Sequence, residues 1–134
     1  MKIDKITYVQ NPEKVNGVQV VNDAFQAIAL LEDGHAVARF EFGDSMSPLL
    51  KSGEYCILEP MRDNMEAEIG DAVFCNVNGY VMTHMVLMKA KNDADDKPYY
   101  QIGSTSGDIY GWTNVIYAIA HGTRVLEKES FIEN

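Results

Sequence analysis

The chain has 134 residues, of which 46% are hydrophobic, and its formal net charge is −9 at pH 7. This length and apolar content fit one compact domain with a real core and argue against disorder. The acidic balance, with no cluster of Lys and Arg, excludes direct binding to a nucleic-acid backbone.

No apolar run reaches the roughly 18 residues that a membrane-spanning helix needs, so no membrane span is expected. The N-terminal segment "MKIDKITYVQNPEKVNG" lacks the apolar stretch of a secretory signal, and the expected location is the cytoplasm. Cys56 and Cys75 lie in apolar runs and are interpreted as buried free thiols. With no Cys-x-x-Cys and no His-x-x-x-His pair, neither a metal nor another cofactor is expected.

Residues 1–19 are polar and are expected to be irregular, with one short strand at 6–9, and residues 20–134 are expected to form a single domain. One helix is predicted from apolar residues at spacings of four, three and three, which are Val21, Phe25, Ile28 and Leu31. Asn22 is the expected N-cap of this helix and Gly34 its expected stop.

From residue 35 the apolar pattern has a period of two, which is typical of strands. Strands are predicted in "HAVARFEF", "EYCILEP", "DAVFCNV", "YVMTHMVLMKA", "YYQIG" and "NVIYAIAHGTRVLE". Asn78-Gly79 between alternating apolar residues predicts a hairpin turn, whereas "STSGDIYGW" is interpreted as a loop. Lys89 and Lys91 are interpreted as solvated. The predicted fold class is mainly β, a twisted antiparallel sheet or partial barrel with one N-terminal helix.

Two residues could form a nucleophile and its base, Ser45 in "FEFGDSMSPLL" and His84 in "YVMTHMVLM". A serine hydroxyl is a weak nucleophile until a nearby base takes its proton. By strand alternation, the face that carries His84 also carries Tyr80, Met82, Val86 and Met88. A lone histidine on such a face can instead be a core or rim residue hydrogen-bonded to a backbone carbonyl. The pattern alone therefore leaves both interpretations open.

Four segments occur in a fixed order over roughly residues 20–126: "GDSMSP", "SGEYCIL", "EIGDAVFCNVNGYVMTHMV" and "YYQIG" followed by "NVIYAIAHGTRV". This ordered set resembles the superfamily of LexA/UmuD-type self-cleaving peptidases and type I signal peptidases. The resemblance implies a LexA/signal-peptidase-like fold and a serine endopeptidase with Ser45 as nucleophile and His84 as base. Most bacterial members use lysine as the base. Thr83-His84 resembles the branch that has Thr-His-Arg there, although Met85 replaces the Arg.

The resemblance also implies a third group that orients the histidine. Asp108 in "STSGDIYGW" is the nearest match, and the alternative is that Asp108 only forms a turn after Gly107. The family usually has Asp or Asn at the position that is Ser104 here.

The residues around Ser45 are expected to build the rest of the site. The backbone N–H of Ser45 is the expected oxyanion donor. Gly43 would let a substrate backbone approach closely, and Asp44 and Pro48 would hold the turn that presents the serine. Met46 completes the Ser-Met-x-Pro motif of the family.

The predicted function is a soluble serine peptidase that cleaves an extended peptide docked on an exposed strand edge. The alternative is a non-catalytic peptide-binding or assembly module of the same fold, which Met85 and Ser104 favour because they replace the family's Arg and Asp. A homodimer is expected from the resemblance and from the apolar closing strand "NVIYAIA", which has few charges on either face.

Overall fold

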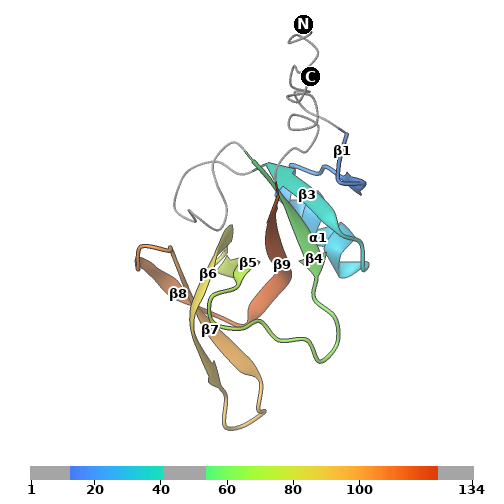
Figure 1. Cartoon of the computed structure of the whole chain (residues 1–134). Coiled ribbons are helices and arrows are strands. Elements are labelled where there is room, and N and C mark those ends of the chain that lie inside the picture. The colour runs from blue at the N-terminus through green and yellow to red at the C-terminus, as the bar shows by residue number, and fades with distance from the viewer. Residues whose placement is uncertain (1–12, 41–53, 124–134) are drawn as a thin grey trace, which may run out of the picture.

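The computed structural model describes residues 13–40 and 54–123. Its elements in chain order are β1 (Lys14–Val15), β2 (Val18–Gln19), α1 (Ala24–Glu32), β3 (Val37–Phe40), β4 (Tyr55–Pro60), β5 (Ala72–Val77), β6 (Tyr80–Lys91), β7 (Pro98–Gly103), β8 (Ile109–Thr113) and β9 (Val115–Thr123). Seven strands form one antiparallel sheet in the order β3-β4-β9-β5-β6-β7-β8. The fold is therefore mainly β, as predicted, with an open twisted sheet and one helix near the N-terminus (Figure 1). The strand predicted at 6–9 lies outside the described residues.

The hairpin between β5 and β6 is confirmed. Asn78 and Gly79 have φ values of 53° and 91°, which place both turn residues in the left-handed region that this turn requires. The amide of Gly79 also donates to the side chain of Asn76 at 2.9 Å. This turn sets Val77 opposite Tyr80 and thereby fixes the register of the whole hairpin.

The helix forms, but its first residue and its buried face differ from the prediction. Asp23, not Asn22, is the N-cap, because its carboxylate accepts from the amide of Gln26 at 2.9 Å. Asn22 instead accepts from the amide of Phe40 in β3. The helix ends at Glu32, and Gly34 follows with a φ of 89°, as expected for a stop.

The helical face that meets the sheet keeps Ile28 and Leu31 of the predicted face but has Ala24 and Ala27 in place of Phe25. Ala27 and Leu31 are buried, with Ala24 and Ile28 beside them, while Phe25 is 77% exposed. The small side chains of Ala24 and Ala27 let the helix lie close to the sheet. The predicted face was chosen from large apolar residues alone, so it did not indicate this close packing.

Residues 14–19, expected to be irregular, form the β1–β2 hairpin. Its turn is Asn16-Gly17, with φ values of 53° and 81°, and this is the same turn signal as at residues 78–79. Val15 is only 1% exposed and packs in a small cluster with Ala38 and Tyr55. The hairpin therefore belongs to the domain.

The segment "STSGDIYGW", expected to be a loop, contains strand β8 in its second half. The chain reverses within residues 104–108, and β8 then pairs antiparallel with β7. Isoleucine and aromatic residues favour strands, so β8 itself carried a signal that the turn residues before it concealed. A register shift in β6 between Val86 and Met88 also breaks the predicted alternation there.

The sheet is covered on both faces, and alternate residues of the central strands enter two different cores. We call the one beside α1 the helix-side core; it consists of Val21, Ala27, Leu31, Val37, Cys56, Leu58, Ala72, Phe74, Ala118 and Ala120. We call the other the connector-side core, because residues 61–71, the connector, cover it; it consists of Ala67, Val73, Cys75, Val77, Val86, Tyr100, Ile102 and Ile119. Both cysteines are buried and free, as predicted.

Strand β9 lies in the middle of the sheet, between β4 and β5. β5 pairs with residues 115–120 of this strand and β4 with residues 118–123, so both of its edges are occupied over residues 118–120. The few charges on this strand, taken above as a sign of a homodimer, are explained by its burial within the sheet.

Candidate active site

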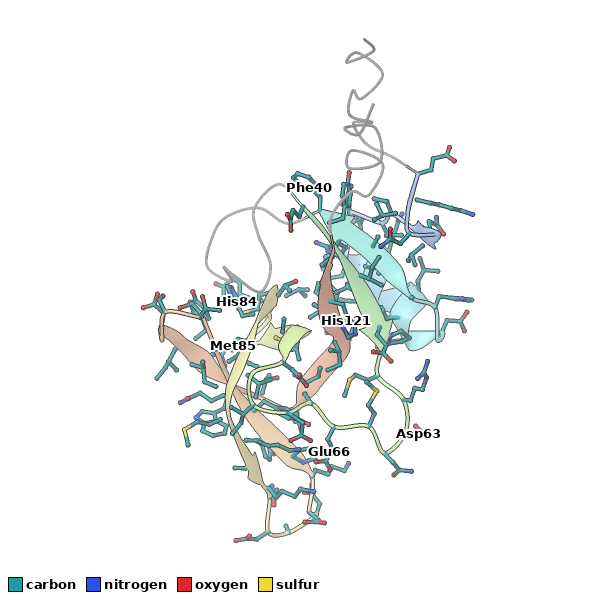
Figure 2. All side chains as sticks on the ribbon, viewed as in Figure 1. Phe40, Asp63, Glu66, His84, Met85 and His121 are labelled. Carbon is teal, nitrogen blue, oxygen red and sulfur yellow. The ribbon has the colours of Figure 1, made fainter. Side chains whose placement is uncertain are left out.

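His84 lies on β6, opposite Val73 of β5. Its neighbours in the alternation, Met82 and Val86, belong to the connector-side core, so His84 is on the face of the sheet away from α1. Its side chain is only partly exposed, and Figure 2 shows it at one end of the β5–β6 pair. The strand thus fixes the histidine at a border between core and solvent.

The ring of His84 contacts the ring of Tyr110 on β8, with 4.5 Å between centroids and an interplanar angle of 42°. Its Nδ1 atom is buried and has no hydrogen-bond partner among the described residues. In the described part of the chain, no backbone carbonyl accepts a hydrogen bond from this nitrogen. Burial lowers the pKa of His84 from the ordinary value of 6.5, so the imidazole is neutral at neutral pH.

Ser104 and Asp108 close the tight turn between β7 and β8. The amide of Ser104 donates to the carbonyl of Asp108 at 2.9 Å, and the amide of Asp108 donates to the Ser104 hydroxyl at 3.1 Å. Gly107 sits between them with a φ of 100°. The backbone of Asp108 thus forms hydrogen bonds that close the turn, and Asp108 as a whole is exposed. The structure does not bring the Asp108 carboxylate to Nδ1 of His84.

Gly103, just before this turn, is required by close packing. A Cβ built there would lie 2.0 Å from the carbonyl oxygen of Asp108 and 2.4 Å from a methyl group of Leu87. Any larger residue would push the turn away from β6. The pair Met85–Gly103 then sets Ser104 one position further along, at the level of His84. Only 1% of Ser104 is exposed, and its hydroxyl also contacts that of Ser106.

Both lysines of β6 form ion pairs; Lys89 is largely covered, contrary to the prediction that it is solvated, whereas Lys91 is exposed, as predicted. Lys89 Nζ lies 2.8 Å from Glu66 and 3.1 Å from Glu68, and its side chain is 17% exposed. Lys91 Nζ lies 3.0 Å from Glu66. The hydrogen bond that each lysine donates to Glu66 raises its pKa above the ordinary value. Neither is therefore suited to act as the neutral lysine base that most bacterial members of the resembled superfamily use.

Ser45 and its expected supporting residues, Gly43, Asp44, Met46 and Pro48, lie outside the described residues. The described chain stops at Phe40 and resumes at Glu54. Phe40 pairs with Tyr55, and the centroids of their rings are 5.0 Å apart. The segment that carries Ser45 therefore leaves from β3 and returns to β4, its neighbour in the sheet. Phe40 and Tyr55 pack with Ile57, on the same face as His84.

The sequence interpretation did not single out a second histidine on this face. His121 on β9 lies 2.9 Å from Glu59 on β4, and Arg62 lies 3.7 Å from the same carboxylate. The pairing of Glu59 with Ile119 and of Ile57 with His121 brings these side chains together. Such a contact depends on the register of two strands far apart in the sequence, so alternation within either strand could not have indicated it.

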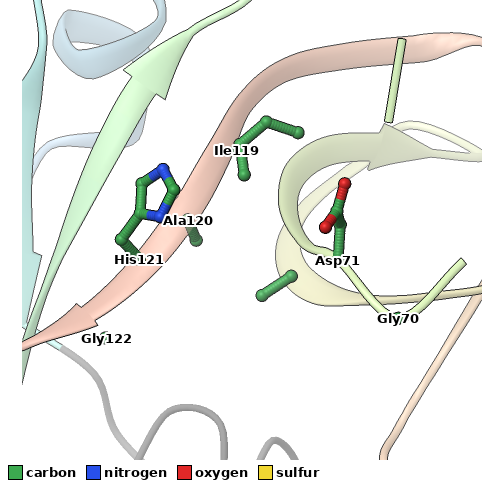
Figure 3. Close-up of a pocket in the computed structure, with 7 residues that line it drawn as sticks. Gly70, Asp71, Ile119, Ala120, His121 and Gly122 are labelled. Carbon is green, nitrogen blue, oxygen red and sulfur yellow. The ribbon is translucent and has the colours of Figure 1, made fainter. Parts of the chain in front are cut away.

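A pocket of about 290 Å³ lies where β5 turns away from β9, and its lining is Gly70, Asp71, Ala72, Ile119, Ala120, His121 and Gly122. Figure 3 shows Asp71 on one side of the opening, while His121 points toward β4. β5 and β9 separate here because β5 begins only at Ala72. The residues before Ala72 are hydrogen-bonded to β6 instead, through Gly70 and Val86. The edge of β9 beyond Ala120 is therefore not paired with β5.

Within residues 13–40 and 54–123, no group of three His, Cys, Asp or Glu side chains is placed to hold a metal ion. In the same part of the chain, no helix is long and apolar enough to cross a membrane. Comparisons with protein-family models, with curated proteins and with solved structures give no match for this chain.

Proposed function

We propose that this protein is a serine peptidase in which Ser45 is the nucleophile and His84 its base. The observation that carries the proposal is the state of His84, which β6 holds at the border between core and solvent and whose pKa is lowered by burial. A neutral imidazole can accept the proton of a serine hydroxyl, and a histidine needs no large pKa shift to do so near neutral pH.

The covalent chain is long enough for this pair. Phe40 lies four strand positions from β6 in the sheet order, which is about 20 Å across a flat sheet. It also lies about four residues, or about 13 Å, beyond the level of His84 along the strands. Five extended residues from Phe40 to Ser45 span up to about 18 Å. The lengths of the two side chains and of the hydrogen bond between them make up the difference.

The proposed reaction is acyl transfer from an extended peptide to water. Ser45 Oγ attacks the scissile carbonyl carbon while Nε2 of His84 takes its proton, and His84 then gives that proton to the leaving amine. Water hydrolyses the acyl-enzyme by the same path. The backbone N–H of Ser45 would stabilise the oxyanion, and Gly43 would let the substrate backbone approach. The reaction uses no cofactor.

The test is cleavage of a peptide library, read by mass spectrometry, for the wild type, Ser45→Ala and His84→Ala. We expect cleavage after small side chains, as the resemblance implies, and a loss of several orders of magnitude in either variant. The rate should fall below about pH 6, because a protonated His84 cannot accept the serine proton. His35→Ala, at an exposed histidine beyond the end of α1, is the matched control and should cleave like the wild type. Equal cleavage by all four proteins would point to a contaminant.

A second candidate function is a non-catalytic peptide-binding module. The unpartnered Nδ1 of His84 favours it, because in a Ser-His-Asp triad a carboxylate fixes this nitrogen. This module would bind peptides with unchanged affinity in Ser45→Ala and His84→Ala and would cleave none of them.

We also propose a cytoplasmic location, which two free buried thiols support. We propose a homodimer as well, and the family resemblance is its support. It would have to use a surface other than the paired stretch of β9, and light scattering at high concentration tests it. A strict monomer would remove it.

A further inference from the structure

His84 is in contact with an aromatic residue from a strand that the sequence did not predict. The ring of Tyr110 lies 4.5 Å from that of His84 and is tilted by 42°, within the range in which aromatic rings attract each other. Tyr110 is 39% exposed, so it covers one side of the imidazole while its own outer side meets solvent.

A catalytic imidazole must be held in one orientation, and the usual holder is an acceptor at Nδ1. Here the polar groups of the neighbouring turn are used otherwise. The Ser104 hydroxyl accepts from the amide of Asp108 and contacts Ser106. Nδ1 of His84 stays buried without a hydrogen-bond partner among the described residues. Within residues 13–40 and 54–123, therefore, no group orients this ring through a hydrogen bond to Nδ1.

Tyr110, in contrast, is on a firmly positioned strand. Gly111 pairs with Ile102 and Ile109 with Gly103, and a register shift between these pairs leaves Tyr110 as the additional residue. Such a bulge redirects a side chain. The turn closed by Ser104 and Asp108, packed tightly on Gly103, fixes where the bulge falls.

We propose that Tyr110 is the positioning residue for His84 and that its ring takes the place of the carboxylate of a triad. Stacking restrains the imidazole by contact area rather than by a hydrogen bond, so the phenolic hydroxyl of Tyr110 is dispensable and its ring is not. An effect of Tyr110 on the reactivity of Ser45 rests on the proposed Ser45–His84 reaction. The claim that Tyr110 orients the ring of His84 does not.

The test combines a spectroscopic and a kinetic measurement on the full chain. The variants are Tyr110→Phe, which keeps the ring, and Tyr110→Ala and Tyr110→Leu, which remove it; the leucine variant keeps apolar volume if alanine weakens the fold. Trp112→Ala is the matched control, because Trp112 is an exposed aromatic residue of the same strand with no ring contact among the described residues. NMR reports the shifts of the carbon-bound ring protons of His84, and a fluorophosphonate reports the labelling rate of Ser45.

We expect the His84 ring protons to lose their ring-current shift in Tyr110→Ala and Tyr110→Leu and to keep it in Tyr110→Phe and Trp112→Ala. The Ser45 labelling rate should fall about two- to tenfold in the first pair, the effect of one aromatic contact, and stay at the wild-type level in the second. Unchanged His84 signals in Tyr110→Ala, or labelling lost equally in Tyr110→Phe, would overturn the proposal. If the wild type does not label at all, the peptidase proposal fails, and the NMR shifts still decide whether the rings of Tyr110 and His84 are in contact.

Discussion

The half-buried His84 links the protein's stability to pH. Burial lowers its pKa in the folded state below the ordinary 6.5, so the unfolded chain binds this proton more tightly than the folded chain does. The free energy of unfolding should therefore fall as the pH is lowered below about 6.5, until the folded-state pKa is passed. Urea unfolding at several pH values, from about one unit above 6.5 to about one and a half units below it, measures the slope.

His84→Gln should remove this part of the slope, because glutamine does not titrate. His35→Gln, at a histidine that is exposed, should keep it. Carboxylates that titrate at lower pH affect all three proteins alike, so the difference between the variants isolates His84. A wild type and a His84→Gln variant with the same slope would show that His84 is not desolvated.

At the scale of elements, the helix depends on a cap that lies one residue later than the sequence indicated. Asp23→Ala should lower the free energy of unfolding by about 1 kcal/mol, because it leaves the amide of Gln26 without its acceptor. Urea denaturation measures this loss. Glu32→Ala, at the exposed last residue of the helix, should change it little. A cost in the control as large as in Asp23→Ala would contradict the assignment of the cap.

The connector is tied to β6 by charge as well as by its apolar side chains. Lys89 of β6 forms ion pairs with Glu66 and Glu68 of the connector. The amide of Ala67 also donates to the buried hydroxyl of Tyr100 on the next strand, β7. We expect Lys89→Met to speed hydrogen exchange in residues 61–71 and to leave β5 unchanged, since β5 is paired on both sides.

Mass spectrometry of peptides from the connector and from β5 reads this difference. Lys97→Met, at an exposed lysine in the β6–β7 turn, is the control and should exchange like the wild type. High salt should reproduce part of the Lys89→Met effect, because it screens ion pairs near the surface. Exchange in the connector that stays at the wild-type rate in Lys89→Met would show that the apolar contacts alone hold it.

Local patterns predicted the elements whose structure is decided locally. Asn78-Gly79 fixes its hairpin by its own backbone preference, and period-two alternation located β4, β5 and β6. The same logic would have found the β1–β2 hairpin at Asn16-Gly17, where flanking polar residues hid the signal. Turn residues likewise concealed β8, although "IYGWT" has the composition of a strand.

The site was predictable only in part. His84 could be placed on a strand and a face from alternation, and the structure confirms both. Its contact with Tyr110 and the pairing of His121 with Glu59 both require knowing which strands are neighbours and in which register. Sequence spacing does not contain that information, because each contact joins segments that meet only in the folded sheet.

At the scale of the whole molecule, β9 joins two halves of the sheet that otherwise do not pair. Strands β3 and β4 lie on one side of it and β5 to β8 on the other. A chain that ends at Asn114 should therefore lose cooperative thermal unfolding, measured by circular dichroism, because its two remaining groups of strands share no hydrogen-bonded edge. A sharp, wild-type-like transition in this shortened chain would contradict the central role of β9.

The position of β9 also sets the order of events during synthesis. The strand at the centre of the sheet is the last of the described strands to leave the ribosome, so the earlier strands must wait with unpaired edges on β4 and β5. The pairing of β4 with β9 closes a long loop, and such non-local pairing slows folding. The nascent chain is thus most open to aggregation, or to a chaperone, just before β9 is made.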